Sequence, residues 1–288
     1  MIRMVRRKSV NGAQPSLAVR SAIAYPQNMQ AVILLGGQGT RLRTLYADRP
    51  KALVPVAGRP FIEWQVKWLR RGGVTQIHLA AGHMADQIKD WAASQEDVTV
   101  SQEPKPLGTG GALQFVESHL IDDRFYLVNG DTLLPNLDFQ RLENRGQKVS
   151  NDWKNQPDFF QRLEKSPQKV PTTGKSAKKV SNDWKIRIAV TQIEEAGRFG
   201  TVEFDAHGVI TAFREKEERA SGWINGGVYR MHRAALADIP PDQFCSLETD
   251  LFPRWATEHR LMACPAEPPL LDMGTPEGLC DMERFLIQ

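Results

Sequence analysis

Residues 31–42 are AVILLGGQGTRL, a short apolar run followed at once by glycines, a threonine and an arginine. The apolar run predicts a buried β-strand, and the glycines predict a tight loop at its end. A glycine-rich loop is often only a turn, but here Arg41, Arg43 and Lys51 favour a cradle for phosphate oxygens. No Gly-Lys-Ser/Thr follows, and Leu42 stands where a dinucleotide fingerprint has its third glycine. The stretch therefore predicts a strand followed by a phosphate-binding loop that is neither a Walker P-loop nor a dinucleotide fingerprint.

Signals for strands and helices alternate beyond this stretch. Strands are predicted at 75–80, 98–101 and 125–128, and helices near 61–71, 84–94 and 111–119. Regular alternation predicts parallel strands, right-handed crossovers and helices on both faces of the sheet. Residues 201–213 predict a β-hairpin and 226–231 a further strand, so an antiparallel edge is expected. The expected fold class is α/β, a doubly wound and mostly parallel mixed sheet with an antiparallel edge.

Composition and charge exclude several function classes. No apolar run approaches the roughly 18 residues of a membrane helix, so no membrane insertion is predicted. Of the net charge of +3, residues 1–28 supply five basic groups and no acid, and residues 139–185 supply eleven basic and five acidic groups. The remaining chain carries −8, so no nucleic-acid partner is expected. Three cysteines without metal spacing indicate a reducing compartment, and the cytoplasm is the predicted location.

Two segments differ from the rest of the chain. Residues 1–28 are expected to be a disordered extension ahead of Met29. FQRLENRGQKV (139–149) recurs as FQRLEKSPQKV (160–170), and KVSNDWK (148–154) recurs at 179–185. This polar, duplicated composition predicts a loop insertion at about 144–184. The remaining residues, 29–288, are predicted to form a single domain that carries this insertion.

Seven motifs occur in the order seen in sugar-1-phosphate nucleotidyltransferases. They are GGQGTRL, PKALVPVAGRP, PLGTGGAL, NGDT, FREK, INGGVY and LDMGTPE. The chain resembles this family over about residues 30–286, apart from the loop around 143–186. CSLETDLFP (245–253), with the pair GTGG and INGGVY, is most similar to D-glycero-α-D-manno-heptose 1-phosphate guanylyltransferases. The resemblance implies a Rossmann-like, GT-A-like nucleotidyltransferase fold.

The resemblance also implies an activity of the EC 2.7.7 type. An oxygen of a sugar 1-phosphate attacks the α-phosphorus of a nucleoside triphosphate, expected to be GTP, and pyrophosphate leaves. Mg²⁺, or Mn²⁺, is the implied cofactor. Mannose-1-phosphate guanylyltransferase, N-acetylmuramate-1-phosphate uridylyltransferase and a catalytically inactive nucleotide-sugar-binding regulatory homologue remain alternatives. The oligomeric state, monomer or homodimer, stays open.

Motif by motif, the resemblance assigns roles to residues of this chain. Asp131 and Asp272 are the implied metal ligands; as alternatives, Asp131 is a turn residue and Asp272 a helix cap. Arg41, Lys51 and Lys216 are the implied catalytic groups, binding phosphates and offsetting charge. The implied nucleotide contacts are Leu35, Gly36, Gly37, Gly39, Thr40, Glu103, Gly108 and Gly111. The implied contacts to the sugar phosphate are Glu215, Asn225 and Gly226, and Asn225 can also be a plain turn residue.

Glu103 is the candidate for reading the base. Guanine presents N1–H and an amino group side by side, which one carboxylate can accept, whereas uracil presents one donor between two acceptors. Two observations leave an alternative open. Pro104-Lys105-Pro106 spaces Glu103 further from GTGG than the resemblance leads us to expect, and backbone groups near Leu35 and Gly36 can read the base instead.

Overall fold

The structure, a computed structural model, describes residues 29–37, 39, 41–42, 45–143, 186–194, 200–214 and 221–287. The predicted extension at 1–28 and the predicted insertion at about 144–184 lie outside the described residues. The division of the chain into one domain with an insertion therefore stays a prediction.

Four parallel strands form one half of the central sheet, in the order β6-β1-β4-β5. They are β1 (Gln30–Leu35), β4 (Gln76–Ala81), β5 (Val98–Gln102) and β6 (Arg124–Asn129). All four were predicted from the sequence, with ends that differ by one residue. The helices that follow β1, β4 and β5 are α1 (Phe61–Arg71), α2 (Ala85–Ala92) and α3 (Gly108–Phe115). This alternation confirms the predicted α/β class.

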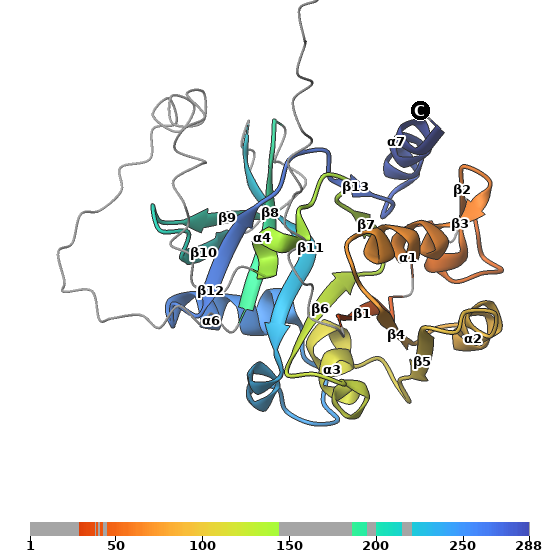
Figure 1. Cartoon of the computed structure of the whole chain (residues 1–288), viewed down its shortest axis with the longest axis horizontal. Coiled ribbons are helices and arrows are strands. Elements are labelled where there is room, and N and C mark those ends of the chain that lie inside the picture. Colours follow the sequence, from red (N-terminus) through yellow and green to blue (C-terminus); the bar gives the residue numbers. More distant parts are fainter. Residues whose placement is uncertain are drawn as a thin grey trace, which may run out of the picture.

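The other half of the sheet is joined through β11 (Gly222–His232), which runs antiparallel to β6. Its remaining strands are β8 (Ile186–Ile193), β9 (Thr201–Phe204), β10 (Ile210–Arg214) and β12 (Leu261–Pro265). The predicted hairpin is present as β9 and β10, whereas β8 and β12 were not predicted. Strands from both halves of the chain thus share one nine-stranded mixed sheet (Figure 1).

Helices cover both faces of the sheet. Side chains of β1 alternate between two buried clusters: Ala31, Ile33 and Leu35 pack with α1, α2 and α4 (Phe139–Glu143), as period two requires. Val32 and Leu34 pack on the opposite face with α3 and α6 (Phe252–Thr257). The sheet is therefore doubly wound, as predicted.

A third apolar cluster lies beneath α7 (Pro276–Ile287), a helix that was not predicted. It also takes residues from two small sheets, β7 (Thr132–Leu133) with β13 (Leu271–Asp272), and β2 (Pro55–Val56) with β3 (Arg59–Pro60). Short helical turns complete the fold: η1 (Lys51–Leu53), η2 (Glu117–His119), η5 (Arg233–Asp238) and η6 (Leu247–Leu251). The first turn of α7 lies against Asp272, since a Cβ at Gly278 would collide with the Asp272 carbonyl.

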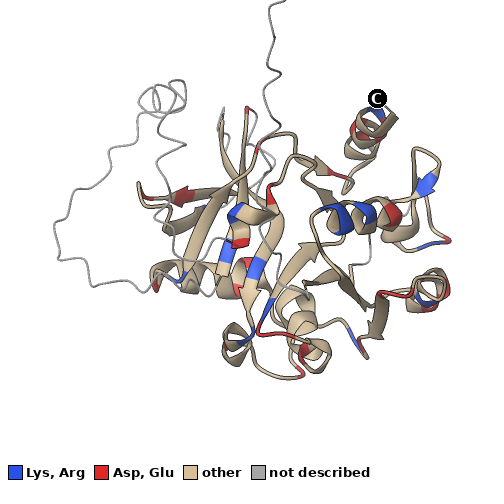
Figure 2. Ribbon diagram, viewed as in Figure 1, with Lys and Arg blue, Asp and Glu red and all other residues tan. Residues whose placement is uncertain are grey.

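One predicted boundary is wrong in a way that matters for the site. The helix predicted near 111–119 begins earlier, at Gly108, so the glycines of GTGG form the first turn of α3. Basic and acidic residues are interspersed over the described ribbon (Figure 2). Within that part of the chain, every helix is too short or too polar to cross a membrane.

Candidate active site

The four parallel strands end at nearly the same level, so their carboxyl ends share one edge of the sheet. The pairing registers of β1 with β4, β1 with β6 and β4 with β5 set this alignment. The residues that directly follow these strands are Gly36, Gly82, Glu103 and Gly130. In doubly wound sheets ligands bind at this edge. Three of these four residues are glycines that other atoms approach closely, and the fourth carries a carboxylate.

The carboxylate of Glu103 lies over Gly36 and Gly82. A Cβ at Gly36 would lie 2.6 Å from Oε1 of Glu103, and a Cβ at Gly82 would be closer still. The backbone N–H of Leu107 donates to Oε2 over 3.3 Å, so Glu103 also reaches the start of α3 despite the intervening Pro-Lys-Pro. Burial raises the pKa of Glu103, and the Leu107 hydrogen bond partly opposes that. Glu103 therefore lies at the ends of β1 and β4, and its role in reading a base stays a prediction.

Lys51 and Asp131 form an ion pair at the same edge. Nζ of Lys51 lies 2.7 Å from Oδ2 of Asp131, and the hydroxyl of Thr132 donates to Oδ1 over 3.0 Å. Asp131 follows Gly130, where a Cβ would collide with the backbone carbonyl of Leu34. Only glycine lets this turn approach β1 so closely. The structure thus brings together two residues that the sequence pattern had assigned to phosphate and metal binding.

Asp272 joins this pair through strand pairing. It lies opposite Thr132 in the β13–β7 ladder, and the N–H of Met273 donates to the carbonyl of Asp131 over 3.0 Å. Burial raises the pKa of Asp272, and the charge of Asp131 raises it further, whereas Gly274, Lys51 and Arg41 lower it. Oδ1 of Asp272 accepts from the N–H of Gly274 over 2.7 Å in the turn that precedes α7. The helix itself is capped by Thr275, whose hydroxyl oxygen accepts from the N–H of Gly278 over 3.1 Å, so the helix-cap alternative for Asp272 is wrong.

The two carboxylates suit a magnesium ion that also binds substrate. Mg²⁺ prefers oxygen ligands and usually takes one or two carboxylates, with phosphate oxygens and water completing its shell. Among the described residues, no three His, Cys, Asp or Glu side chains are grouped closely enough to hold a metal. Asp131 and Asp272 therefore fit a metal shared with phosphates better than an ion held by protein alone.

The predicted phosphate loop between β1 and η1 is described in part. Gly39 has a φ of +58°, which favours glycine, and a Cβ there would lie 3.3 Å from Cβ of Lys51. Gly37 and Arg41 are exposed, and nothing lies within 4 Å of a Cβ placed at Gly37. Thr40 lies outside the described residues. Among the described residues of this loop, Gly39 therefore packs on Lys51 and Leu42 is buried in the third apolar cluster, whereas Gly37 and Arg41 face solvent.

The glycines of GTGG contact another part of the chain. The N–H groups of Gly110 and Gly111 donate to the carbonyl of Cys245 over 2.8 and 3.1 Å. A Cβ at Gly108 would lie 2.6 Å from that carbonyl, and one at Gly111 would lie 2.5 Å from the carbonyl of Gln243. This close packing explains why side chains are absent here. The nucleotide contact expected of Gly108 and Gly111 stays a prediction.

The expected sugar side of the site is described only in part, since Glu215 and Lys216 lie outside the described residues. Asn225 Oδ1 accepts from the N–H of Gly227 over 3.0 Å, and its amide donates to the hydroxyl of Tyr229 over 2.8 Å. A Cβ at Gly226 would lie 2.6 Å from Leu134. Asn225 thus lies inside β11, at an irregularity in its pairing with β8, and not in a turn between elements as its alternative role required. Its sugar contact stays a prediction.

Two residues at this edge were missed from the sequence. Gly82 is one of many glycines, and only the position of Glu103 beside it gives it a role. Gln65 is buried in the middle of α1, where its side chain donates to the carbonyls of Asn129 and Thr132. A signal for Gln65 was present, because it is the one polar residue on the apolar face of the predicted helix 61–71.

Comparison with known proteins identifies two matching families. Residues 31–152 match the MobA-like NTP transferase domain, and residues 167–288 match the family described as nucleotidyl transferase. Between them the two matches span both halves of the sheet.

Among curated proteins, a D-glycero-α-D-manno-heptose 1-phosphate guanylyltransferase of Campylobacter jejuni is 28% identical over 262 residues, which are 90% of this chain and 99% of the relative. The mannose-1-phosphate guanylyltransferase catalytic subunit beta of Xenopus tropicalis is 31% identical over 265 residues, 88% of this chain and 64% of that protein. Among solved structures, HddC from Yersinia pseudotuberculosis complexed with GMP-PN has a TM-score of 0.68 and 26% identity. That match covers 90% of this chain and 99% of the other.

Proposed function

This chain belongs to the sugar-1-phosphate nucleotidyltransferase family, and on that basis we propose that it transfers GMP from GTP to a sugar 1-phosphate. The proposed acceptor is D-glycero-α-D-manno-heptose 1-phosphate, the sugar named for the relative that this chain matches over 99% of its length. The products would be an NDP-sugar and pyrophosphate. The three cysteines are free, which suits the reducing cytoplasm proposed for this reaction.

One observation carries this proposal: strand pairing brings Asp272 beside Asp131, whose carboxylate is held 2.7 Å from Lys51 at the end of the glycine loop. Two carboxylates and a lysine beside open backbone form a site for a metal-bound triphosphate. A catalytically inactive homologue would have no need to keep these groups together. We therefore favour an active enzyme.

In the proposed reaction, an oxygen of the sugar phosphate forms a bond to the α-phosphorus of GTP. The bond from that phosphorus to the pyrophosphate oxygen breaks, so no covalent protein intermediate is needed. Lys51 and Arg41 offset the charge that moves onto the departing pyrophosphate. Asp131 and Asp272 would hold Mg²⁺, which, when bound, neutralises phosphate charge and orients the reacting groups. The protein supplies positioning and electrostatic stabilisation.

The position of Glu103 supports guanine as the base. Its carboxylate lies over the ends of β1 and β4 and can accept both N1–H and the amino group of guanine, whereas uracil would present an acceptor in place of the second donor. A site built for paired hydrogen bonds rejects a partner that leaves its polar groups unpaired. Mannose-1-phosphate guanylyltransferase is the second candidate, favoured by the 31% identity to the Xenopus protein. Both candidates use the same base.

Pyrophosphate release tests the proposal, measured with each of GTP, UTP, dTTP and ATP against heptose 1-phosphate and mannose 1-phosphate. We expect GTP to be preferred, with heptose 1-phosphate the better acceptor. Preference for UTP or dTTP would overturn the assignment of the base. The variant Glu103→Gln should lose the preference, whereas Glu96→Gln, which changes an exposed acid elsewhere, should keep it. GTP preference that survives Glu103→Gln would remove Glu103 from the mechanism.

A further inference from the structure

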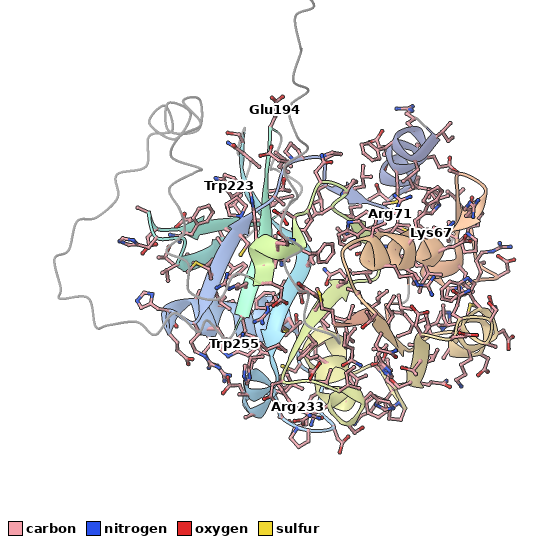
Figure 3. All side chains as sticks on the ribbon, in the orientation of Figure 1. Lys67, Arg71, Glu194, Trp223, Arg233 and Trp255 are labelled. Atoms are coloured by element: carbon pink, nitrogen blue, oxygen red, sulfur yellow. The ribbon has the colours of Figure 1, made fainter. Side chains whose placement is uncertain are left out.

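The buried face of α1 carries a single amide. Its buried residues are Phe61, Ile62, Gln65, Val66 and Leu69, and Gln65 is fully buried. The outward face carries the cations Lys67 and Arg71, both labelled in Figure 3. Burying an amide among apolar residues is unfavourable unless its polar atoms are hydrogen-bonded. The bonds that Gln65 makes therefore indicate what it does.

Both donors of the Gln65 amide bind one turn of the backbone. Nε2 donates to the carbonyl of Asn129 over 2.8 Å and to that of Thr132 over 2.9 Å. These carbonyls bracket Gly130 and Asp131, which lie between β6 and β7. Oε1 is buried and has no hydrogen-bond partner among the described residues. Only the donor side of the amide is used, so the contact depends on two N–H groups and not on shape alone.

The bracketed turn carries one carboxylate of the candidate site and pairs with the strand that carries the other. Asp131 is bound there by Lys51, and Thr132 pairs with Asp272 in the next strand. A restraint on both ends of the turn thus fixes where Asp131 lies and also the register that brings Asp272 beside it. We infer that Gln65 is a positioning residue for Asp131 and Asp272, acting from helix α1 through the backbone of residues 129–132.

A competing view is that Gln65 only fills space in the core. An unbranched apolar side chain of similar volume would then serve equally well. The variant Gln65→Met separates the two views, because it keeps the volume and removes both donors. Val66→Ala is the matched control: Val66 is its buried neighbour on the same helix, and the substitution removes core volume but no hydrogen bond to the turn.

The first measurement is hydrogen exchange of the whole chain without ligands. Gln65→Met should speed exchange of the amides of residues 130–133 about tenfold relative to those of β4. Val66→Ala should change both sets by a similar factor, because it weakens the core as a whole. An unchanged ratio in Gln65→Met would overturn the inference. If that variant does not fold, Gln65→Asn retracts the amide by one methylene and carries the same expectation.

The second measurement is turnover, and this part rests on the proposed function. A displacement of about 1 Å in the carboxylate pair is expected to lower kcat about 100-fold in Gln65→Met, while KM for GTP changes little. Val66→Ala should keep the kcat of the wild type at temperatures where it is folded. Faster exchange at the turn with unchanged kcat would refute the positioning role. Absence of turnover in the wild type with every substrate pair would instead refute the proposed function, and the exchange ratio would still decide the restraint by Gln65.

Discussion

Gly82 offers a way to move the Glu103 carboxylate without changing its chemistry. In Gly82→Ala the new Cβ would lie 2.9 Å from Cα of Gly36 and within collision distance of Oε1 of Glu103. Ordinary contact begins at 3.4 Å, so the oxygen has to retreat by about 1 Å. The carboxylate ends a flexible side chain and can retreat, whereas the contact with Gly36 requires a backbone shift of about 0.5 Å, half the displacement of the oxygen. We therefore expect a displaced base-reading group in a folded protein.

The size of the effect follows from the hydrogen bonds that this displacement stretches. A retreat of about 1 Å takes a bond of about 2.8 Å beyond the range in which it contributes. A hydrogen bond to a charged acceptor contributes about 1.5–3 kcal/mol, so the loss of both bonds to guanine should lower kcat/KM for GTP at least 100-fold. ITP lacks the amino group and loses only one bond. The GTP-to-ITP ratio of kcat/KM should therefore fall about tenfold.

The assay compares kcat/KM for GTP and ITP in the wild type, Gly82→Ala, Glu103→Gln and the double variant. If Gly82→Ala acts through the Glu103 carboxylate, it should change the GTP-to-ITP ratio little in the Glu103→Gln background. The reason is that the effects of substitutions at contacting residues do not add. An equal fall of the ratio in both backgrounds would refute the reasoning. So would an equal loss of GTP and ITP activity in Gly82→Ala alone.

Asp131→Asn and Asp272→Asn should each lower kcat by orders of magnitude, because each removes one negative charge from the metal site. The thermal midpoint of each variant should stay close to that of the wild type. Near-normal turnover of both variants at modest Mg²⁺ would contradict this prediction. Burial lowers the pKa of His78 from 6.5 to about 4. Between these two pH values the unfolded state takes up a proton that the folded state does not. The free energy of unfolding should therefore fall by about 3 kcal/mol as the pH is lowered from 6.5 to 4. Urea unfolding at several pH values should show a smaller loss of stability toward acid pH in His78→Gln than in the wild type. A variant of the exposed His207 should lose as much stability as the wild type. Replacing residues 144–184 with a short linker should leave a soluble enzyme of similar thermal midpoint by calorimetry, because this polar sequence cannot bury a core; an insoluble variant would contradict that reasoning.

The sequence predicted the parts of the fold whose signals are local. Helix α1 was predicted to the residue, because an apolar period begins after Pro60 and ends at Gly72-Gly73. The strand and glycine loop at 31–42 were predicted for the same reason. The start of the helix predicted near 111–119 was placed too late because glycine disfavours helices, and the helical turn of GTGG depends on the distant carbonyl of Cys245.

The missed parts depend on partners far along the chain. Strand β12 is short, and its place in the sheet depends on pairing with β8. Strand β8, IRIAVTQI, does carry a local signal, because it is rich in β-branched residues, but it was overlooked beside the duplicated segment. In the site, Lys51 and Asp131 were each predicted, but their contact required the fold. Gly82 and Gln65 were overlooked because their roles appear only when Glu103 and the 129–132 turn lie beside them.

The packing of GTGG on residues 243–245 has a consequence for how this chain tolerates change over evolution. The joint is made mostly through the main chain: Cys245 accepts from Gly110 and Gly111 and donates to the carbonyl of Leu107. Side-chain identity at the exposed position 244 should therefore drift freely among descendants of this sequence. Loss or gain of a single residue between 243 and 245 should be purged, because it would shift every bond of the joint at once. Length, more than composition, is the inherited property of this segment.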